Sequence, residues 1–388
     1  MGKIPGGDLM TQQSANHGSF ISALQFGMLA AGMTSISNHA LAVTYLLKAG
    51  GRDAWLAGFL ALPVTLLAVW AMIALSRMYP GKSLVQYLPE VAGPLFGRIL
   101  AASYILYFFG SSIFTLRRTT DWIVDSLLPE SPPTVLAALY LTACLAAAAG
   151  GIEVLARTNQ FTLPLLTAVG MFVSFATAPS KNYGFLLPIL ADGPEPALRS
   201  AWVALGIFGE LCILGMIIHF VRGTQRILKP ALLAVLYSVI TMTGPLTGAI
   251  ATLGHRQGAN MPYPTFQQWL MISFARFLER TDLLVAHQWL VGAYVRTGLL
   301  LLAVTMGLRQ LFGRGRPSWI LGMSGVIVFT LSISLFRSTL AFDAFVSTLY
   351  LPTGAILGIV VPVFLWVIAV LRRMVAGGGV RGGANHKA

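Results

Sequence analysis

Residues 201–221, AWVALGIFGELCILGMIIHFV, decide how the rest of the chain is interpreted. The stretch is long enough to cross a bilayer and carries one carboxylate, Glu210, near its middle. A charge at that depth is costly, so we expect Glu210 to face a cavity or a partner. Gly206 and Gly209 each lower helix propensity by about 1 kcal/mol relative to Ala, which favours an interrupted helix here. The alternative is a glycine-lined helix contact with Glu210 neutral or paired.

The composition is that of a membrane protein with many spans. Hydrophobic residues make up 56% of the chain, charged residues 10%, and the mean hydropathy is +0.75. Apolar runs of spanning length predict ten transmembrane helices, near residues 20–47, 54–76, 95–127, 133–150, 159–178, 200–221, 229–253, 281–308, 317–336 and 345–371. We therefore predict an all-α membrane protein.

Charge and cysteine usage narrow the class further. The formal net charge is +13, but no soluble domain is predicted that could carry a basic patch for nucleic acid. Most basic residues fall on one side if both termini are cytoplasmic, as the positive-inside rule requires. Cys144 and Cys212 each lie inside an apolar run, so neither a disulfide framework nor a metal cluster is indicated.

The first predicted span carries a polar cluster at mid-depth. Thr34, Ser35, Ser37 and Asn38 interrupt an otherwise apolar run. This pattern favours a break that matches the one in the sixth span. The alternative is a kinked but continuous helix, because Ser and Thr can bond to carbonyls of their own helix.

The order of the spans predicts two halves. If spans one and six are the first members of two five-helix sets, the sets must be inserted in opposite senses, and a binding site is expected where they meet. The predicted transmembrane domain covers 20–374, with repeat one at 20–178 and repeat two at 196–374. Residues 1–19 are predicted to form a disordered cytoplasmic tail, and 375–388 a flexible basic cytoplasmic tail.

Two further spans carry candidate site residues. Tyr107 and Ser111 are four residues apart and share a helix face, either lining a pocket or packing against a helix. Arg296 is the only basic residue that we place deep in a span. Its planar fork fits a carboxylate, so it must pair with Glu210, with backbone carbonyls at a break, or with a ligand carboxylate.

Charged residues near the ends of the spans are predicted to have structural roles. At the outer end of the third span, we favour a solvated helix end over an ion pair between Arg117 and Asp121. In FLERTD, residues 277–282, the charges of Glu279, Arg280 and Asp282 predict a small ion-pair network. No P-loop, dinucleotide fingerprint, HExxH or zinc spacing occurs in the sequence, so we expect no enzyme, cofactor or metal site.

Several segments together resemble one family. The segments are ISALQ (21–25), GRDAWL (51–56), YPGKSLVQYLPEVAGPLFGRI (79–99), GGIEVLAR (150–157), FGEL (208–211) and PTFQQWLMISFARFLERTDLL (264–284). In this order they resemble the B subunits of spore germination receptors (the GerAB type), a branch of the amino acid–polyamine–organocation superfamily.

The resemblance implies a LeuT-like fold of ten helices in the inner membrane of a bacterial endospore. It also implies that the chain senses a small nutrient germinant, often an amino acid, together with an A subunit and a lipoprotein C subunit. The ligand positions of the family correspond here to Ser35, Ile36, Ser37, Tyr107, Ser111, Phe208, Gly209, Glu210 and Arg296. The chain departs from the family in having GMTSISN (32–38) in place of a Gly-x-Gly break, and Arg296 in place of a smaller polar residue.

The leading hypothesis is a germinant sensor. Arg296 and the amides at the helix breaks would capture a ligand carboxylate over an aromatic floor of Tyr107 and Phe208. The ligand shifts a two-state element only if it binds one state more tightly than the other. Two alternatives stay open: a secondary transporter of amino acids driven by protons through Glu210, and a scaffold whose pocket binds nothing.

Overall fold

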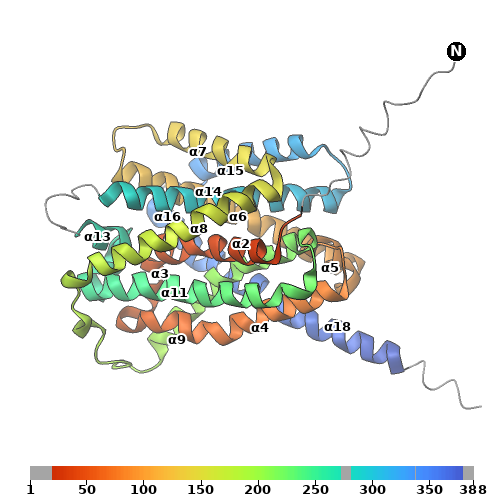
Figure 1. The fold of residues 1–388 in the computed structure, drawn as a ribbon, viewed down its shortest axis with the longest axis horizontal. Helices are drawn as coiled ribbons and strands as arrows, with labels where there is room; N and C mark the ends of the chain where they lie inside the picture. The colour runs from red at the N-terminus through yellow and green to blue at the C-terminus, as the bar shows by residue number, and fades with distance from the viewer. Residues whose placement is uncertain (1–19, 272–280, 337, 379–388) are drawn as a thin grey trace, which may run out of the picture.

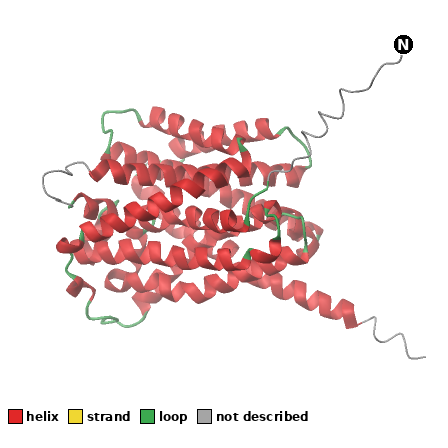
Figure 2. Ribbon diagram, in the orientation of Figure 1, coloured by secondary structure: helices red, strands yellow, loops and turns green. Residues whose placement is uncertain are grey.

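The chain folds into a bundle of helices (Figure 1). The computed structural model describes residues 20–271, 281–336 and 338–378, and Figure 2 shows that helices make up nearly all of them. In these residues the only β-type pairing is an isolated bridge between Ile21 and Val221. The predicted N-terminal tail and the predicted charges Glu279 and Arg280 lie outside the described residues, as does the C-terminal tail beyond Gly378, where α18 ends.

The first half of the chain, from residue 20 onward, contains seven α-helices. They are α2 (Ala23–Ile36), α3 (Val43–Gly50), α4 (Ala57–Met78), α5 (Leu84–Ala92), α6 (Pro94–Ser126), α7 (Pro133–Ala149) and α8 (Gly151–Ala176). A π-helical segment, η1 (Ser37–Leu41), lies between α2 and α3, and the 3₁₀ segment η2 (Gly51–Leu56) connects α3 to α4.

The second half begins with α9 after two 3₁₀ turns, η3 (Ala178–Ser180) and η4 (Tyr183–Leu186). Its α-helices are α9 (Glu195–Phe208), α10 (Leu214–Ile217), α11 (Leu228–Leu253), α12 (His255–Asn260), α13 (Pro264–Leu270), α14 (Thr281–Phe312), α15 (Pro317–Ser334), α16 (Thr339–Phe345), α17 (Leu351–Ala355) and α18 (Val361–Gly378). The 3₁₀ segments are η5 (Gly209–Ile213), η6 (Ile218–Phe220) and η7 (Thr224–Arg226), and the π segments are η8 (Val346–Tyr350) and η9 (Ile356–Val360).

The all-helical membrane fold is confirmed. Eight helical stretches among the described residues are long and apolar enough to cross a bilayer, and α7 is a shorter apolar helix. The count of ten spans stays a prediction, because α2 has 14 residues before its winding changes. The stretches that contain α6, α9 and α14 are mostly buried, whereas the buried share is only 22% for α8 and 28% for α15. Figure 1 shows α2 inside the bundle, where it contacts α8, α11 and α14.

The winding of spans one and six changes where the sequence predicts. In span one, α2 gives way to the π segment η1 at Ser37. In span six, α9 gives way to the 3₁₀ segment η5 at Gly209. Both interruptions are changes of helix type, and the backbone of Ser37, Phe208 and Gly209 keeps right-handed helical angles. The structure therefore matches the alternative, a distorted but continuous helix, with the change of winding at the predicted positions and no unwound segment at Ser37 or Gly209.

The glycines of span six allow a very close helix contact. A Cβ atom on Gly209 would lie 2.0 Å from the carbonyl oxygen of Gly354, and one on Gly206 would lie 2.5 Å from that of Leu351. Such distances are far inside van der Waals contact, so only glycine fits at either position. These glycines thus match the alternative drawn from the sequence, a glycine-lined helix contact, and Gly209 also begins the 3₁₀ segment η5.

One end of the bundle carries many basic residues. There the two interrupted spans are joined by backbone bonds: Ile21 N–H donates to Phe220 O over 3.0 Å, and Arg222 N–H donates to Ile21 O over 3.2 Å. Arg157, Arg222 and Arg226 line one groove at this end, and Arg77 and Lys82 line a second. These residues were predicted to share the cytoplasmic side.

Candidate functional site

A buried ion pair lies where the interrupted spans meet. Glu210 is 1% exposed and Arg296 is 0% exposed. Nη2 of Arg296 donates to Oε1 of Glu210 over 2.7 Å, and Nη1 donates to Oε2, so the pair is bidentate. Glu210 comes from η5 and Arg296 from the middle of α14. Glu210 is the first of the three partners predicted for Arg296.

Arg296 also uses a carbonyl that the π segment releases. The N–H of Ser37 bonds to Thr34 O, where a regular α-helix would use Met33 O. Met33 O instead accepts from Nη1 of Arg296 over 3.1 Å. The second predicted partner of Arg296, a backbone carbonyl at a break, is thus present as well.

The donors of Arg296 are fully used. Nε donates to Thr115 Oγ1 over 2.8 Å, and Nη2 donates to Tyr350 Oη over 3.2 Å. With the bonds to Glu210 and Met33, all five N–H groups of the guanidinium have partners. A ligand carboxylate could therefore reach Arg296 only by displacing one of them. Thr115 and Tyr350 were not predicted as site residues.

Glu210 is equally well bonded. Oε2 accepts from Ser37 Oγ over 3.0 Å as well as from Arg296, and Oε1 accepts from Tyr350 Oη as well as from Arg296. The carboxylate is thus shared between the two interrupted spans, α14 and the last span. Removing one partner of such a pair costs about 3 to 5 kcal/mol, because the other charge stays buried without compensation.

Tyr350 connects the ion pair to an aromatic stack. It is the last residue of η8, and its ring stacks on Phe114 with centroids 4.7 Å apart and on Tyr107 with centroids 5.7 Å apart. Its hydroxyl also lies 3.2 Å from Ser111 Oγ. The sequence signal for Tyr350 was a hydroxyl-bearing aromatic residue deep in an apolar span, two residues before Pro352.

The predicted site residues do not all meet. Ser37, Ser111, Glu210 and Arg296 belong to this cluster, and Tyr107 reaches it through Tyr350. The remaining four, Ser35, Ile36, Phe208 and Gly209, are buried beside it and make no side-chain hydrogen bond to Glu210 or Arg296.

The predicted floor also differs from the observed one. The aromatic surface beside the ion pair consists of Tyr107, Tyr350 and Phe114. Phe208 was predicted in this place from the family resemblance. Gly209 packs instead on Gly354, which brings η5 against the last span.

A second buried arginine lies nearer the opposite end of the bundle. Arg118 is 1% exposed, with Nη1 3.7 Å from Asp343 Oδ1, and Tyr45 Oη donates to the same oxygen over 2.7 Å. Two sequence interpretations are corrected here. Arg296 is not the only basic residue buried in a span, and Arg117 pairs with Asp121 at 2.9 Å in partly buried surroundings, so the preferred solvated end was wrong.

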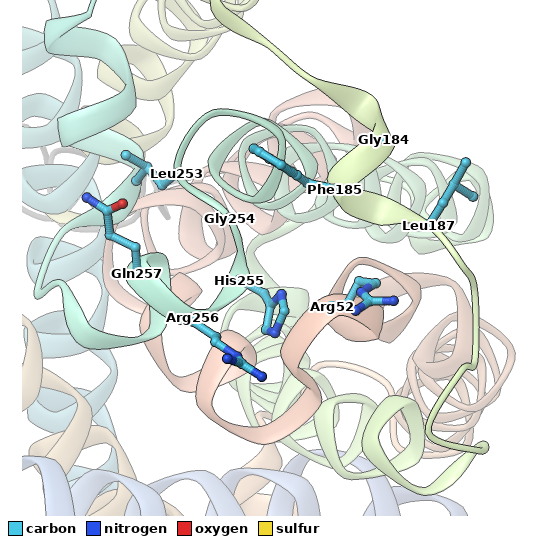
Figure 3. A pocket seen from close by; sticks show the side chains of 9 residues that line it. All are labelled: Arg52, Gly184, Phe185, Leu187, Leu253, Gly254, His255, Arg256 and Gln257. Carbon is cyan, nitrogen blue, oxygen red and sulfur yellow. The ribbon is translucent and has the colours of Figure 1, made fainter.

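A surface pocket of about 360 Å³ lies apart from the ion pair. Figure 3 shows its basic side chains, Arg52, His255 and Arg256, with Phe185 and Leu187 on the other side. Partial burial lowers the pKa of His255, and the charges of Arg52 and Arg256 lower it further. No residue predicted for the site lines this pocket.

Comparisons with known sequences point to one family. A family profile described as spore germination protein matches residues 21–339. Spore germination protein XB of Bacillus anthracis is 27% identical over 353 residues, which cover 89% of this chain and 98% of that protein. Spore germination protein KB of Bacillus subtilis strain 168 is 25% identical over 331 residues, covering 83% of this chain and 88% of that protein.

Solved structures with the same fold are transporters. MhsT in complex with L-phenylalanine matches with a TM-score of 0.62 at 15% identity, covering 88% of this chain and 89% of that one. A Na⁺-coupled sialic acid symporter matches with a TM-score of 0.61 at 13% identity, covering 88% and 79%. At such identities the likeness concerns the fold, and it confirms the LeuT-like architecture.

Proposed function

The chain belongs to the spore germination protein family, and from this premise we propose that it is the solute-binding B subunit of a nutrient germinant receptor. The observation that carries the proposal is the fully bonded ion pair of Glu210 and Arg296, held between two interrupted spans of an integral membrane protein. Such a pair is a poor source of stability, because desolvation offsets the attraction. The pair is instead suited to binding, because Glu210 and Arg296 can each exchange the other for an opposite charge on a ligand.

The ligand class follows from charge balance. A simple carboxylate that displaced Glu210 from Arg296 would leave Glu210 buried without a partner. An amino acid carries both charges, so its carboxylate can take Arg296 while its ammonium takes Glu210. Every charge then stays paired, which favours a zwitterion over an anion of the same size.

Ligand insertion would also move helices. Glu210 lies on η5 and Arg296 on α14, so a molecule inserted between them separates span six from span eight. Tyr350 bonds to both partners and would transmit the change to the last span. The germinant thus favours the separated state, because only that state offers both charges to it. We propose that an A subunit and a lipoprotein C subunit respond to this movement of the helices.

The proposed orientation in the membrane follows from the distribution of basic residues. The arginine-rich end, with Arg157, Arg222 and Arg226, is assigned to the cytoplasm, and both termini with it. The membrane is the inner membrane of the spore, and the division into inverted repeats at 20–178 and 196–374 is retained as part of the proposal. The role is binding and signalling, without catalysis.

The test removes both charges at once, since Arg296→Met alone would leave Glu210 buried and unpaired. The variant Glu210→Gln with Arg296→Met keeps the side-chain volumes and the fold, and we expect it to lose amino acid binding in calorimetry of the purified protein. Spores carrying it should contain the protein and fail to respond to the germinant. The control is Glu195→Gln with Arg199→Met, which removes an exposed i, i+4 pair of α9. A normal dose-response from the first double variant would refute the proposal.

The likeness to symporters favours one second candidate, a proton-driven amino acid transporter. Gradient-driven uptake by the purified protein in liposomes would support transport, provided that the double variant at Glu210 and Arg296 abolishes it. A protein that neither binds nor transports, and whose deletion removes the A subunit, would support the scaffold alternative.

A further inference from the structure

A groove of about 1000 Å³ opens at the basic end of the bundle, beside the bridge between spans one and six. Its lining comes from the start of α2, the first turns of α8 and the connection between η6 and α11. Three candidate spans have their ends here, at Gly151, Phe220 and Thr224. Because the ends of spans lie at the membrane surface, the groove is at the level of the lipid headgroups.

The lining carries a surplus of positive charge. Arg157, Arg222 and Arg226 contribute three guanidinium groups, whereas Glu153 is the only acidic residue in the described lining. The carboxylate of Glu153 is already in use: Oε1 accepts from Phe20 N–H over 2.9 Å, and Oε2 lies 3.5 Å from Arg157 Nη2. The side chains of Arg222 and Arg226 form no ion pair within the part of the chain that the structure describes. The groove thus offers two guanidinium groups to an anion.

One side of the groove is apolar and open. Phe20 is 42% exposed and Leu24 is 62% exposed, and both line the groove. Cζ of Arg222 lies over the ring of Phe20, 4.8 Å from its centroid, so the charge and the apolar surface adjoin. A free anion would satisfy the arginines and leave the apolar side uncovered. An anionic phospholipid supplies both parts, a phosphate for the arginines and acyl chains for the apolar side.

We propose that this groove binds an anionic phospholipid, whose phosphate accepts from Arg222 and Arg226 while its acyl chains cover the apolar side. A guanidinium suits a phosphate because its planar fork donates two parallel hydrogen bonds. Basic pockets between spans bind the headgroups of anionic lipids in the same way. The backbone N–H of Arg222 donates to Ile21 O, so the bound lipid lies against the bridge that joins spans one and six. This site does not depend on the amino acid site proposed above.

The experiment uses the full chain in nanodiscs of phosphatidylcholine that contain a rising fraction of phosphatidylglycerol. A trace of photoreactive phosphatidylglycerol labels the protein, and mass spectrometry maps the labelled positions. We expect labelling of residues 20–24, 153–157 and 222–226, which unlabelled phosphatidylglycerol suppresses to saturation. Photoreactive phosphatidylcholine with the same acyl chains should label these positions no more than other lipid-facing ones. Soluble glycerol phosphate tests the free anion and should leave the labelling unchanged.

A double variant and a matched control locate the site. Arg222→Gln with Arg226→Gln should raise the half-saturating fraction of phosphatidylglycerol about tenfold or more, because each arginine near an anionic surface contributes about 1 kcal/mol. Arg314→Gln with Arg316→Gln removes the same charge outside the groove and should leave that fraction unchanged. All four arginines are exposed, so both double variants should fold.

Four outcomes would overturn the proposal. Equal effects of the two double variants would mean attraction to the charged surface without a defined site. Equal labelling by photoreactive phosphatidylcholine would mean that any lipid covers the apolar side. Suppression of the labelling by glycerol phosphate would assign the arginines to a free anion. Absence of labelling in the groove would leave its charge to another occupant, such as an acidic segment of a partner protein.

Discussion

At the scale of single residues, the ion pair depends on groups that look unremarkable in the sequence. The carbonyl of Met33 is available only because η1 shifts the hydrogen bond of Ser37. Thr115 satisfies Nε of Arg296, and the hydroxyl of Tyr350 bonds to both charges. Two side chains and one carbonyl thus complete a cluster whose predicted members are the charged pair, Ser37 and Ser111.

Tyr350→Phe tests this arrangement. The change keeps the stacked ring and deletes a hydroxyl that serves two buried charges, so we expect a loss of about 1 to 3 kcal/mol in stability. Thermal unfolding of the purified protein measures it. Tyr183→Phe, at a residue that is 56% exposed, is the control and should leave the unfolding temperature unchanged. Equal unfolding temperatures for both variants would mean that the hydroxyl of Tyr350 does not stabilise the ion pair.

At the scale of elements, glycine contacts set how span six meets the last span. Gly206 and Gly209 face the backbone of α17 and its neighbours at distances that exclude a Cβ. The same contact places η5 beside α17 and η9, from where the side chain of Glu210 reaches Tyr350 at the end of η8. The position of the Glu210 carboxylate therefore depends on a backbone-to-backbone contact that only glycine allows.

Gly209→Ala should separate these elements. The added Cβ would meet Gly354 O at 2.0 Å, and overpacking of this kind typically costs about 1 to 3 kcal/mol. We expect a lower unfolding temperature together with weaker amino acid binding. Gly244→Ala on α11 is the matched control, because nothing lies within 4 Å of a Cβ there and its helix propensity should improve. An unchanged Gly209→Ala variant would contradict the close contact.

At the scale of the whole molecule, the central pair lies between two sets of closing contacts. The bridge of Ile21 to Phe220 and Arg222 joins spans one and six at the basic end. Towards the other end, Asp343 receives bonds from Tyr45 and contacts Arg118. The first set joins the interrupted spans to each other, and the second joins α3 and α6 to α16, so we expect access to Glu210 to require at least one of them to open.

Cys212 offers a direct measure of that opening. It lies two residues from Glu210 in η5 and is 1% exposed, so a thiol reagent should modify it slowly. Ile21→Pro removes the N–H that donates to Phe220 O, and we expect faster modification of Cys212 in a Cys144→Ala background. Ile21→Ala also loses the side chain but keeps the N–H, and it is the control. Equal rates in the two variants would show that the bridge does not close this end.

The sequence by itself determined the class of the protein, the positions of the two interrupted spans and the charged residues of the site. Hydropathy over a bilayer's length and the cost of burying Glu210 and Arg296 are strong local signals, and they do not depend on which helices are neighbours. The family resemblance added the LeuT-like architecture.

Only the tertiary structure decided how these residues are used. It paired Arg296 with Glu210 in place of leaving the guanidinium free for a ligand, and it brought the ring of Tyr350, stacked on Phe114, to the pair. It also buried Arg118, close to the partly buried pair of Arg117 and Asp121. Each of these outcomes depends on contacts between residues far apart in the chain, such as Gly209 on Gly354, and those contacts have no signature in local composition.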